Sequence, residues 1–256
     1  MDVRWEEVGV PPPKTGGGWE RLTRRVGRKR LPVWDCTVGL VVGDDAVLLI
    51  DPGSCLREGA GLRAEAEALT GRSVTHLAFT HGHFDHVLGA AAFSGAEVFG
   101  AVGLDAELAT GREGLREDAV RHGLAAEEAA EAADLLVLPR HLVSGEWTLD
   151  LGGVQVLLAN VGPGHTRHDL AVCVPGERET VFCGDLVEES GEPQAGPDAV
   201  PARWPAALER LLSLGGEDAL YVPGHGAVVD AAFVRAQRAA LAARFGVSEA
   251  WERPLS

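Results

Sequence analysis

Short apolar runs separated by turn residues recur along the chain from about residue 33 onward. Residues 38–42 and 46–50 flank the turn Gly43-Asp44-Asp45, a pattern that predicts a β-hairpin. Similar runs predict further strands at residues 74–79, 146–151, 154–161, 170–174, 180–183 and 219–222. The predicted strands therefore gather in both halves of the chain.

Apolar positions at helical spacing predict α-helices in each half. Residues 56–69 have this spacing and are followed by Gly71, a residue type that commonly ends a helix. Further helices are predicted at residues 87–93, 103–138, 204–214 and 231–244. Because each half closes with helices, we expect two sheets packed face to face with helices outside, in one domain spanning residues 1–256. Residues 1–30 would supply N-terminal edge strands, with a Pro/Gly-rich loop at residues 11–18.

Charge and composition narrow the range of partners. The formal net charge of −15 argues against a nucleic-acid partner, because a phosphate backbone rewards clustered positive charge. The basic run at residues 24–30 is interpreted as a solvated edge strand. The sequence has no apolar stretch of membrane-spanning length and no secretory signal, so we expect a cytoplasmic protein without a membrane partner. Cys173 and Cys183 lie in apolar runs, which predicts buried and unreactive thiols.

A dense group of candidate metal ligands follows the predicted strand at residues 74–79. Three histidines and an aspartate lie within the six residues 81–86. A loop that leaves a strand can direct His81 and His83 at one cation, while Asp85 and His86 point toward a second. Imidazole nitrogen and carboxylate oxygen are ligands that Zn²⁺ prefers, and such sites also accept Fe²⁺ or Mn²⁺. This segment therefore predicts a metal site.

The segment Thr80-His81-Gly82-His83-Phe84-Asp85-His86 resembles the H-x-H-x-D-H signature of the metallo-β-lactamase superfamily. Other motifs resemble those of the family in the same order, each at the end of a predicted strand: Leu49-Ile50-Asp51-Pro52-Gly53, Gly162-Pro163-Gly164-His165-Thr166, Cys183-Gly184-Asp185 and Pro223-Gly224-His225-Gly226. The resemblance covers nearly the whole chain. It implies an α/β (α+β) fold, the four-layer αββα sandwich, which agrees with the order of predicted elements.

The resemblance also implies a set of ligands, divided between two cations. One metal would be held by His81, His83 and His165, and a second by Asp85, His86 and His225, with Asp185 bridging the two. Asp51 would orient the metal-binding loop from behind the ligands. Two zinc ions per chain are expected, although iron or manganese would also fit these ligand types.

The implied chemistry is hydrolysis. Two cations that share a water lower its pKa to near neutrality and supply a hydroxide, while one of them polarises the substrate carbonyl or phosphoryl oxygen. Asp185 would act as the bridge between the cations. Asp85 is the candidate that moves a proton to the leaving group.

Within the superfamily, Asp185 favours the glyoxalase-II-like thioesterases and the lactonases over the antibiotic-hydrolysing members. We therefore predict a hydrolase of a small ester, thioester or lactone. Neither named activity is assigned, because no tyrosine follows Asp185 closely and no basic tail resembles that of glyoxalase II. The alternatives are a single-iron redox enzyme of the persulfide dioxygenase type, a β-lactamase-like amide hydrolase and a non-enzymatic binding protein on the same scaffold.

Substrate contacts are predicted from position. Arg167 and His168 follow the third histidine where the family often continues Pro-Gly-Ser, and they are the candidates for substrate binding. The helical segment 103–138 and the loop 188–204 would shape the pocket. The expected partner is a small-molecule substrate, and a homodimer remains open.

Overall fold

The computed structural model describes residues 17–247 and contains two β-sheets. The seven-stranded sheet has the order β1(Glu20–Arg21), β2(Val26–Arg30), β3(Thr37–Val42), β4(Val47–Ile50), β5(His76–Ala78), β6(Glu97–Ala101) and β7(His141–Val143). Its strands pair antiparallel from β1 to β4 and parallel from β4 to β7. The predicted hairpin is the β3–β4 pair.

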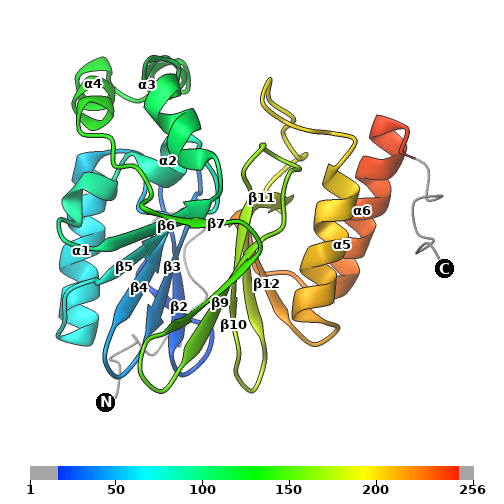
Figure 1. The fold of residues 1–256 in the computed structure, drawn as a ribbon, viewed down its shortest axis with the longest axis horizontal. Helices are drawn as coiled ribbons and strands as arrows, with labels where there is room; N and C mark the ends of the chain where they lie inside the picture. The colour runs from blue at the N-terminus through cyan, green and yellow to red at the C-terminus, as the bar shows by residue number, and fades with distance from the viewer. Residues whose placement is uncertain (1–16, 248–256) are drawn as a thin grey trace.

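The five-stranded sheet has the order β12(Leu220–His225), β11(Thr180–Glu188), β10(Leu170–Val174), β9(Gln155–Asn160) and β8(Glu146–Asp150). Its strands are antiparallel except for β11 and β12, which run parallel. Figure 1 shows the two sheets face to face in the middle of the molecule.

The helices are α1(Leu56–Thr70), α2(Phe84–Val87), the 3₁₀ turn η1(Ala90–Ala92), α3(Leu104–Arg121), α4(Ala126–Asp134), α5(Trp204–Gly215) and α6(Ala231–Phe245). Helices cover the outer face of each sheet, while α3 and α4 lie above the sheets in Figure 1. In Figure 1, α1 lies beside the seven-stranded sheet and α5 and α6 lie beside the other sheet. The chain leaves α1 through Gly71 at φ 70°, whose N–H donates to the carbonyl of Glu67, as the sequence pattern predicted.

Three apolar cores lie between the four layers, and side-chain alternation along the strands explains them. On β10, Leu170 and Val172 pack into the core between the sheets. Ala171 and Cys173, which alternate with them, pack into the core that also contains Trp204 of α5. A third core joins the seven-stranded sheet to α1 and α3. The predicted αββα sandwich is thus confirmed.

Some elements differ from the sequence-based expectation. Strands β6 and β7 were not predicted, β5 is shorter than residues 74–79, and the helix expected at 87–93 is divided into α2 and η1. The prediction for the basic run was wrong, because β2 lies inside the sheet between β1 and β3. Its Arg28 is buried, with Nε donating to Glu20 (2.7 Å) and Nη1 donating to the carbonyl of Gly226 (3.0 Å). Most of the loop predicted at residues 11–18 lies outside the described residues.

The four cysteines are buried and unpaired, which confirms the prediction for Cys173 and Cys183. Burial raises the pKa of Cys173 to about 12, so its thiol keeps its proton at neutral pH. Within residues 17–247, no helix combines the length and the apolar character needed to cross a membrane.

Candidate metal centre

The candidate ligands meet at the edge of the sandwich where the parallel strands have their carboxyl ends. Asp51 directly follows β4, and His225 is the last residue of β12. The segment that contains His81 and His83 follows β5, and α2 begins one residue after His83. Asp185 lies within β11. Parallel strands direct the residues after them to a common edge, so positions far apart in sequence converge here.

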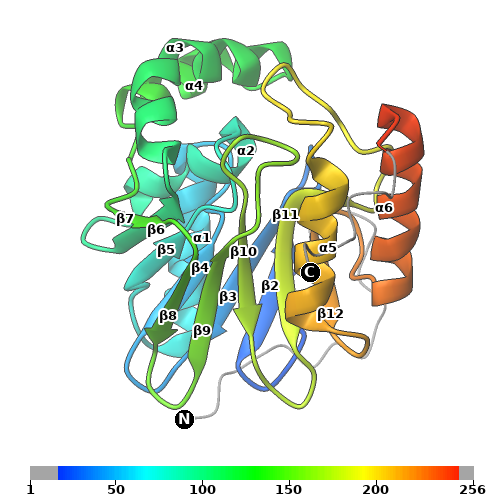
Figure 2. The same cartoon turned by 45° about the vertical axis from the view of Figure 1, so that its right-hand side comes forward.

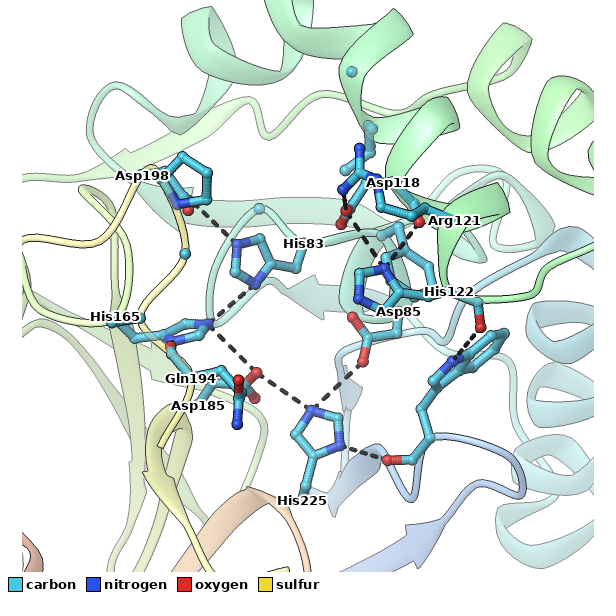
Figure 3. A pocket seen from close by; sticks show the side chains of 18 of the residues that line it. His83, Asp85, Asp118, Arg121, His122, His165, Asp185, Gln194, Asp198 and His225 are labelled. Atoms are coloured by element: carbon cyan, nitrogen blue, oxygen red, sulfur yellow. Dashed lines mark hydrogen bonds and ion pairs between the residues drawn. The ribbon is translucent and has the colours of Figure 1, made fainter. Parts of the chain in front are cut away.

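His81, His83 and His165 form the first group, which we call group A. Nδ1 of His83 lies 3.0 Å from Nε2 of His165. Oδ2 of Asp185 lies 3.4 Å from Nε2 of His165 and 3.7 Å from Nε2 of His81. Figure 3 shows the imidazoles of His83 and His165 and the carboxylate of Asp185 in one continuous series of contacts.

The outer hydrogen bonds of group A determine which ring nitrogen carries the lone pair. Nδ1 of His165 donates to the carbonyl of Gln194 (3.1 Å), and Nε2 of His83 donates to Oδ2 of Asp198 (3.0 Å). Nδ1 of His81 lies 3.0 Å from Oγ1 of Thr80.

That hydroxyl already donates to Oδ2 of Asp51 (2.7 Å), so Oγ1 of Thr80 accepts from His81. The remaining nitrogen of each group A ring therefore turns a lone pair toward the shared space. Three convergent lone pairs suit a cation.

Asp85, His86 and His225 form the second group, which we call group B. Nε2 of His225 lies 3.5 Å from Oδ2 of Asp85 and 3.3 Å from Oδ2 of Asp185. Nε2 of His86 lies 3.2 Å from Oδ1 of Asp185 and 3.6 Å from Oδ2 of Asp85. Behind the rings, Nδ1 of His86 donates to Oδ2 of Asp51 (2.9 Å). Asp51, placed by the sequence behind the ligands, thus contacts both His86 and Thr80.

Asp185 lies between the two groups because the backbone around it makes room. Gly184 has φ +53°, and a Cβ there would lie 2.6 Å from Oγ1 of Thr80. A Cβ on Gly224 of the neighbouring strand would lie 1.8 Å from Oδ1 of Asp185. Glycine at these two positions lets the carboxylate approach the histidines from both groups.

The charges at the site fit divalent cations. Burial lowers the pKa of His165 to about 4, so its ring is neutral at neutral pH. Burial alone would lower the pKa of His225, but the carboxylates of Asp185 and Asp85 raise it to about 10. The carboxylates thus attract positive charge to group B. Among the described residues, six buried side-chain atoms lack a hydrogen-bond partner, and two of them, Nε2 of His81 and Oδ1 of Asp185, lie at this site. A cation would satisfy both atoms, so the donor set fits the metals that the resemblance implies.

Cys36 belongs to the surroundings of group B, which the sequence did not predict. Its Sγ lies 3.3 Å from the carbonyl oxygen of Asp85 and 3.8 Å from each ring nitrogen of His86. Burial raises the pKa of this thiol to about 12, so it is a neutral donor to the Asp85 carbonyl. We assign it a packing role beside group B.

A cavity of about 820 Å³ opens from both groups. Helix α3 forms one wall, with Leu108 and Leu115 among its lining residues, and the loop between β11 and α5 forms another. Segments 103–138 and 188–204 thus both reach the cavity, although no α4 residue is among the described residues that line it. Arg167 lines the cavity. His168 does not, and its Nε2 instead faces Glu107 of α3 at 3.6 Å.

Sequence reasoning did not identify Trp34, Gln194 or Asp198 as site residues. Nδ1 of His225 donates to the backbone carbonyl of Trp34 (2.7 Å), and Gln194 likewise acts through its carbonyl. Backbone acceptors leave no signal in residue type. Asp198 is one of many carboxylates in an acidic chain, so only its placement in space distinguishes it.

Comparison with known proteins identifies the family to which the sequence is similar. The sequence model of the metallo-beta-lactamase superfamily matches residues 31–225. Metallo-beta-lactamase domain-containing protein 1 of Xenopus laevis is 28% identical over 196 residues, which cover 75% of this chain and 71% of that protein.

Solved structures share the fold. A metallo-beta-lactamase from Pontibacter korlensis aligns with a TM-score of 0.68 at 20% identity, over 87% of this chain and 97% of that chain. FIM-1 from Pseudomonas aeruginosa, a metallo-beta-lactamase solved in a mono-zinc form, aligns with a TM-score of 0.65 at 21% identity, over 92% of this chain and 99% of that chain. At these identities the likeness extends to the fold alone.

Proposed function

Because the chain belongs to the metallo-beta-lactamase superfamily, we propose that it is a hydrolase that uses two divalent cations, normally zinc, on small acyl substrates. Group A would hold one cation and group B the other. The observation that carries the proposal is the position of Asp185, whose carboxylate faces Nε2 of His81, His165, His86 and His225 at 3.2–3.7 Å. A carboxylate shared by two histidine groups suits a bridge between two cations.

When bound, the cations supply a nucleophile derived from water at neutral pH and polarise the substrate oxygen. The chain's own residues position that chemistry. His165 is neutral and can bind without first losing a proton, because its pKa is about 4. Asp85 lines the cavity, and its Oδ2 lies 3.5 Å from Nε2 of His225. It is therefore placed to pass a proton to a leaving group in the cavity.

The charges on the cavity wall favour an uncharged acyl substrate over a polyanion. Two arginines, Arg121 and Arg167, line the cavity. Among the lining residues that are not candidate metal ligands, carboxylates still outnumber them: Glu107, Asp118, Glu188, Glu192 and Asp198. Repulsion from these groups would oppose a nucleic-acid chain. Trp34, Phe84 and Leu115 supply apolar surface for an acyl group.

The test is a substrate panel on zinc-loaded protein. Aryl esters, acyl thioesters and lactones would be compared with a bis-aryl phosphodiester and a chromogenic cephalosporin, before and after chelation. We expect acyl turnover that chelation abolishes and zinc restores. Turnover confined to the phosphodiester or the cephalosporin would contradict the substrate class.

Metal content separates the proposal from redox chemistry. Protein purified without chelator or affinity metal should contain about two zinc ions per chain if both groups are filled. One iron per chain with oxygen consumption on a persulfide would instead support the single-iron enzyme. Protein that takes up no metal on titration would contradict the hydrolase.

A further inference from the structure

The ligand histidines differ in what supports them from behind. The ring of His81 is held by Thr80, which lies two residues after the end of β5. The ring of His86 is held by Asp51, which directly follows β4. Their side chains are also enclosed, with exposed fractions of 1% and 0%. Packing alone therefore restricts the orientation of these two rings.

His83 and His165 depend instead on one loop, the segment between β11 and α5. Within it, the carbonyl of Gln194 accepts from Nδ1 of His165 (3.1 Å), and Oδ2 of Asp198 accepts from Nε2 of His83 (3.0 Å). Figure 2 shows this loop, in yellow, extending over the edge of the sandwich toward α3. Two of the three group A rings thus take their outer hydrogen bond from a span of five residues.

His83 relies most on this support. Its side chain keeps 27% of its surface exposed, so packing does not lock the ring as it locks His81 and His86. The hydrogen bond to Asp198 is the contact that sets both its tautomer and its orientation. With Nε2 donating to a carboxylate, Nδ1 presents a lone pair toward His165 and the shared space of group A.

We propose that Asp198 is a positioning residue for His83, through which the loop between β11 and α5 governs metal binding at group A. This inference rests on the proposed function. Without the carboxylate, the His83 ring can rotate or place its proton on Nδ1, and either change removes one ligand from group A. Group B has no contact with Asp198 and keeps its partners Asp51 and the Trp34 carbonyl.

The experiment compares metal affinity at the two groups in full-length protein. Wild type and the variants Asp198→Ala and Asp198→Asn would be equilibrated with a graded zinc buffer, and retained zinc per chain would be measured. Glu192→Gln is the matched control, because it removes a carboxylate charge from the same loop without touching a ligand histidine.

We expect Asp198→Ala to require on the order of 10- to 100-fold more free zinc to fill one of its two sites, while the other site fills as in wild type. Asp198→Asn should fall between, because its amide oxygen can still accept from Nε2 of His83. Glu192→Gln should match wild type in zinc affinity at both sites. Cobalt substitution gives an independent readout, since a change of ligand geometry at one site alters only part of the visible absorption.

Two results would overturn the proposal: unchanged zinc affinity in Asp198→Ala, or equal weakening of zinc binding at both sites. The second would indicate a purely structural role for the carboxylate. Failure of the proposed function has a different signature, because wild type itself would then fail to bind two metal ions.

Discussion

The backbone carbonyl of Trp34 accepts a 2.7 Å hydrogen bond from Nδ1 of His225, and this contact joins the two sheets at the site. Trp34 lies in the turn between β2 and β3, whereas His225 ends β12. Because a carbonyl can only accept, the bond places a proton on Nδ1 and turns Nε2 toward Asp85 and Asp185. The tautomer of His225 is thus set by the opposite sheet.

Proton release should accompany metal binding at group B. Without a cation, His225 is protonated at neutral pH, because the Asp185 and Asp85 carboxylates overcome burial and raise its pKa to about 10. A metal must displace that proton from Nε2. Burial opposes a charge on His86 too, but the carboxylates around it likewise raise the pKa of that ring well above its usual range. Apparent affinity should therefore rise at least tenfold per pH unit between about pH 6 and pH 8. His165, with a pKa of about 4, contributes no such dependence in this range. Calorimetric titration in buffers of different ionisation enthalpy measures the released protons, and uptake of two zinc ions without proton release would contradict the assignment.

Asp185→Asn should disable the site while leaving the fold intact. The substitution removes the negative charge that faces histidines of both groups. We expect zinc per chain to fall from two toward one and turnover to fall by roughly 100-fold or more. This loss should exceed the effect of removing a residue that only hydrogen-bonds a ligand from behind. Glu146→Gln, an exposed carboxylate on β8, is the control and should match wild type. Full activity of Asp185→Asn with two zinc ions bound would exclude the bridging role.

Two glycine-to-alanine substitutions should change the free energy of unfolding in opposite directions. A Cβ on Gly224 would lie 1.8 Å from Oδ1 of Asp185, so Gly224→Ala must displace that carboxylate. We expect its zinc affinity to drop roughly tenfold or more, with a stability loss of about 1–3 kcal/mol. Gly61 of α1 has no neighbouring atom within 4 Å of an added Cβ, so Gly61→Ala should raise the free energy of unfolding by about 0.5–1 kcal/mol. Zinc titration and urea unfolding check both variants, and a Gly224→Ala protein that binds zinc normally would refute the packing argument.

Asp169 should make stability fall as pH rises. Burial raises its pKa to about 7, although its Oδ1 accepts from both the N–H and the hydroxyl of Thr166. Between about pH 4 and pH 7 the native state keeps a proton that the unfolded chain has lost, so the free energy of unfolding decreases with pH by up to roughly 4 kcal/mol and then levels off. Asp169→Asn keeps an oxygen acceptor for Thr166 but cannot ionise. Urea unfolding at both ends of this range should show a flatter profile for the variant, and parallel profiles would contradict the prediction.

The sequence predicted the elements that have strong local patterns. Helix α1 combines apolar spacing with Gly71, and the β3–β4 hairpin has a polar turn, so both were identified close to their observed bounds. The structure also brings together the seven residues that the resemblance assigned as ligands. Asp185 lies within β11, His225 ends β12, and the other five lie in segments that follow strands. Their role as ligands remains a proposal that metal analysis tests.

The remaining features depend on tertiary context. Strand β6 contains a glutamate and a glycine among its five residues, so it lacks the continuous apolar run that identified the shorter strand β4. Arg28 looked solvated, but the contacts with Glu20 and the Gly226 carbonyl that bury it come from other strands and loops. Asp198 lies 115 residues from His83, and no local pattern can report such a pairing.

The candidate ligands come from both halves of the sandwich: Asp185 and His225 lie in the five-stranded sheet, whereas His81 belongs to the segment that follows β5 of the seven-stranded sheet. Cations bound by His81, Asp185 and His225 would therefore connect the two halves of the sandwich, as a cross-link connects distant parts of a chain. To unfold, the chain would first have to release its metal, so bound zinc should slow unfolding and delay digestion by proteases. In such a protein, the lifetime of the folded chain would depend on the supply of metal as much as turnover does.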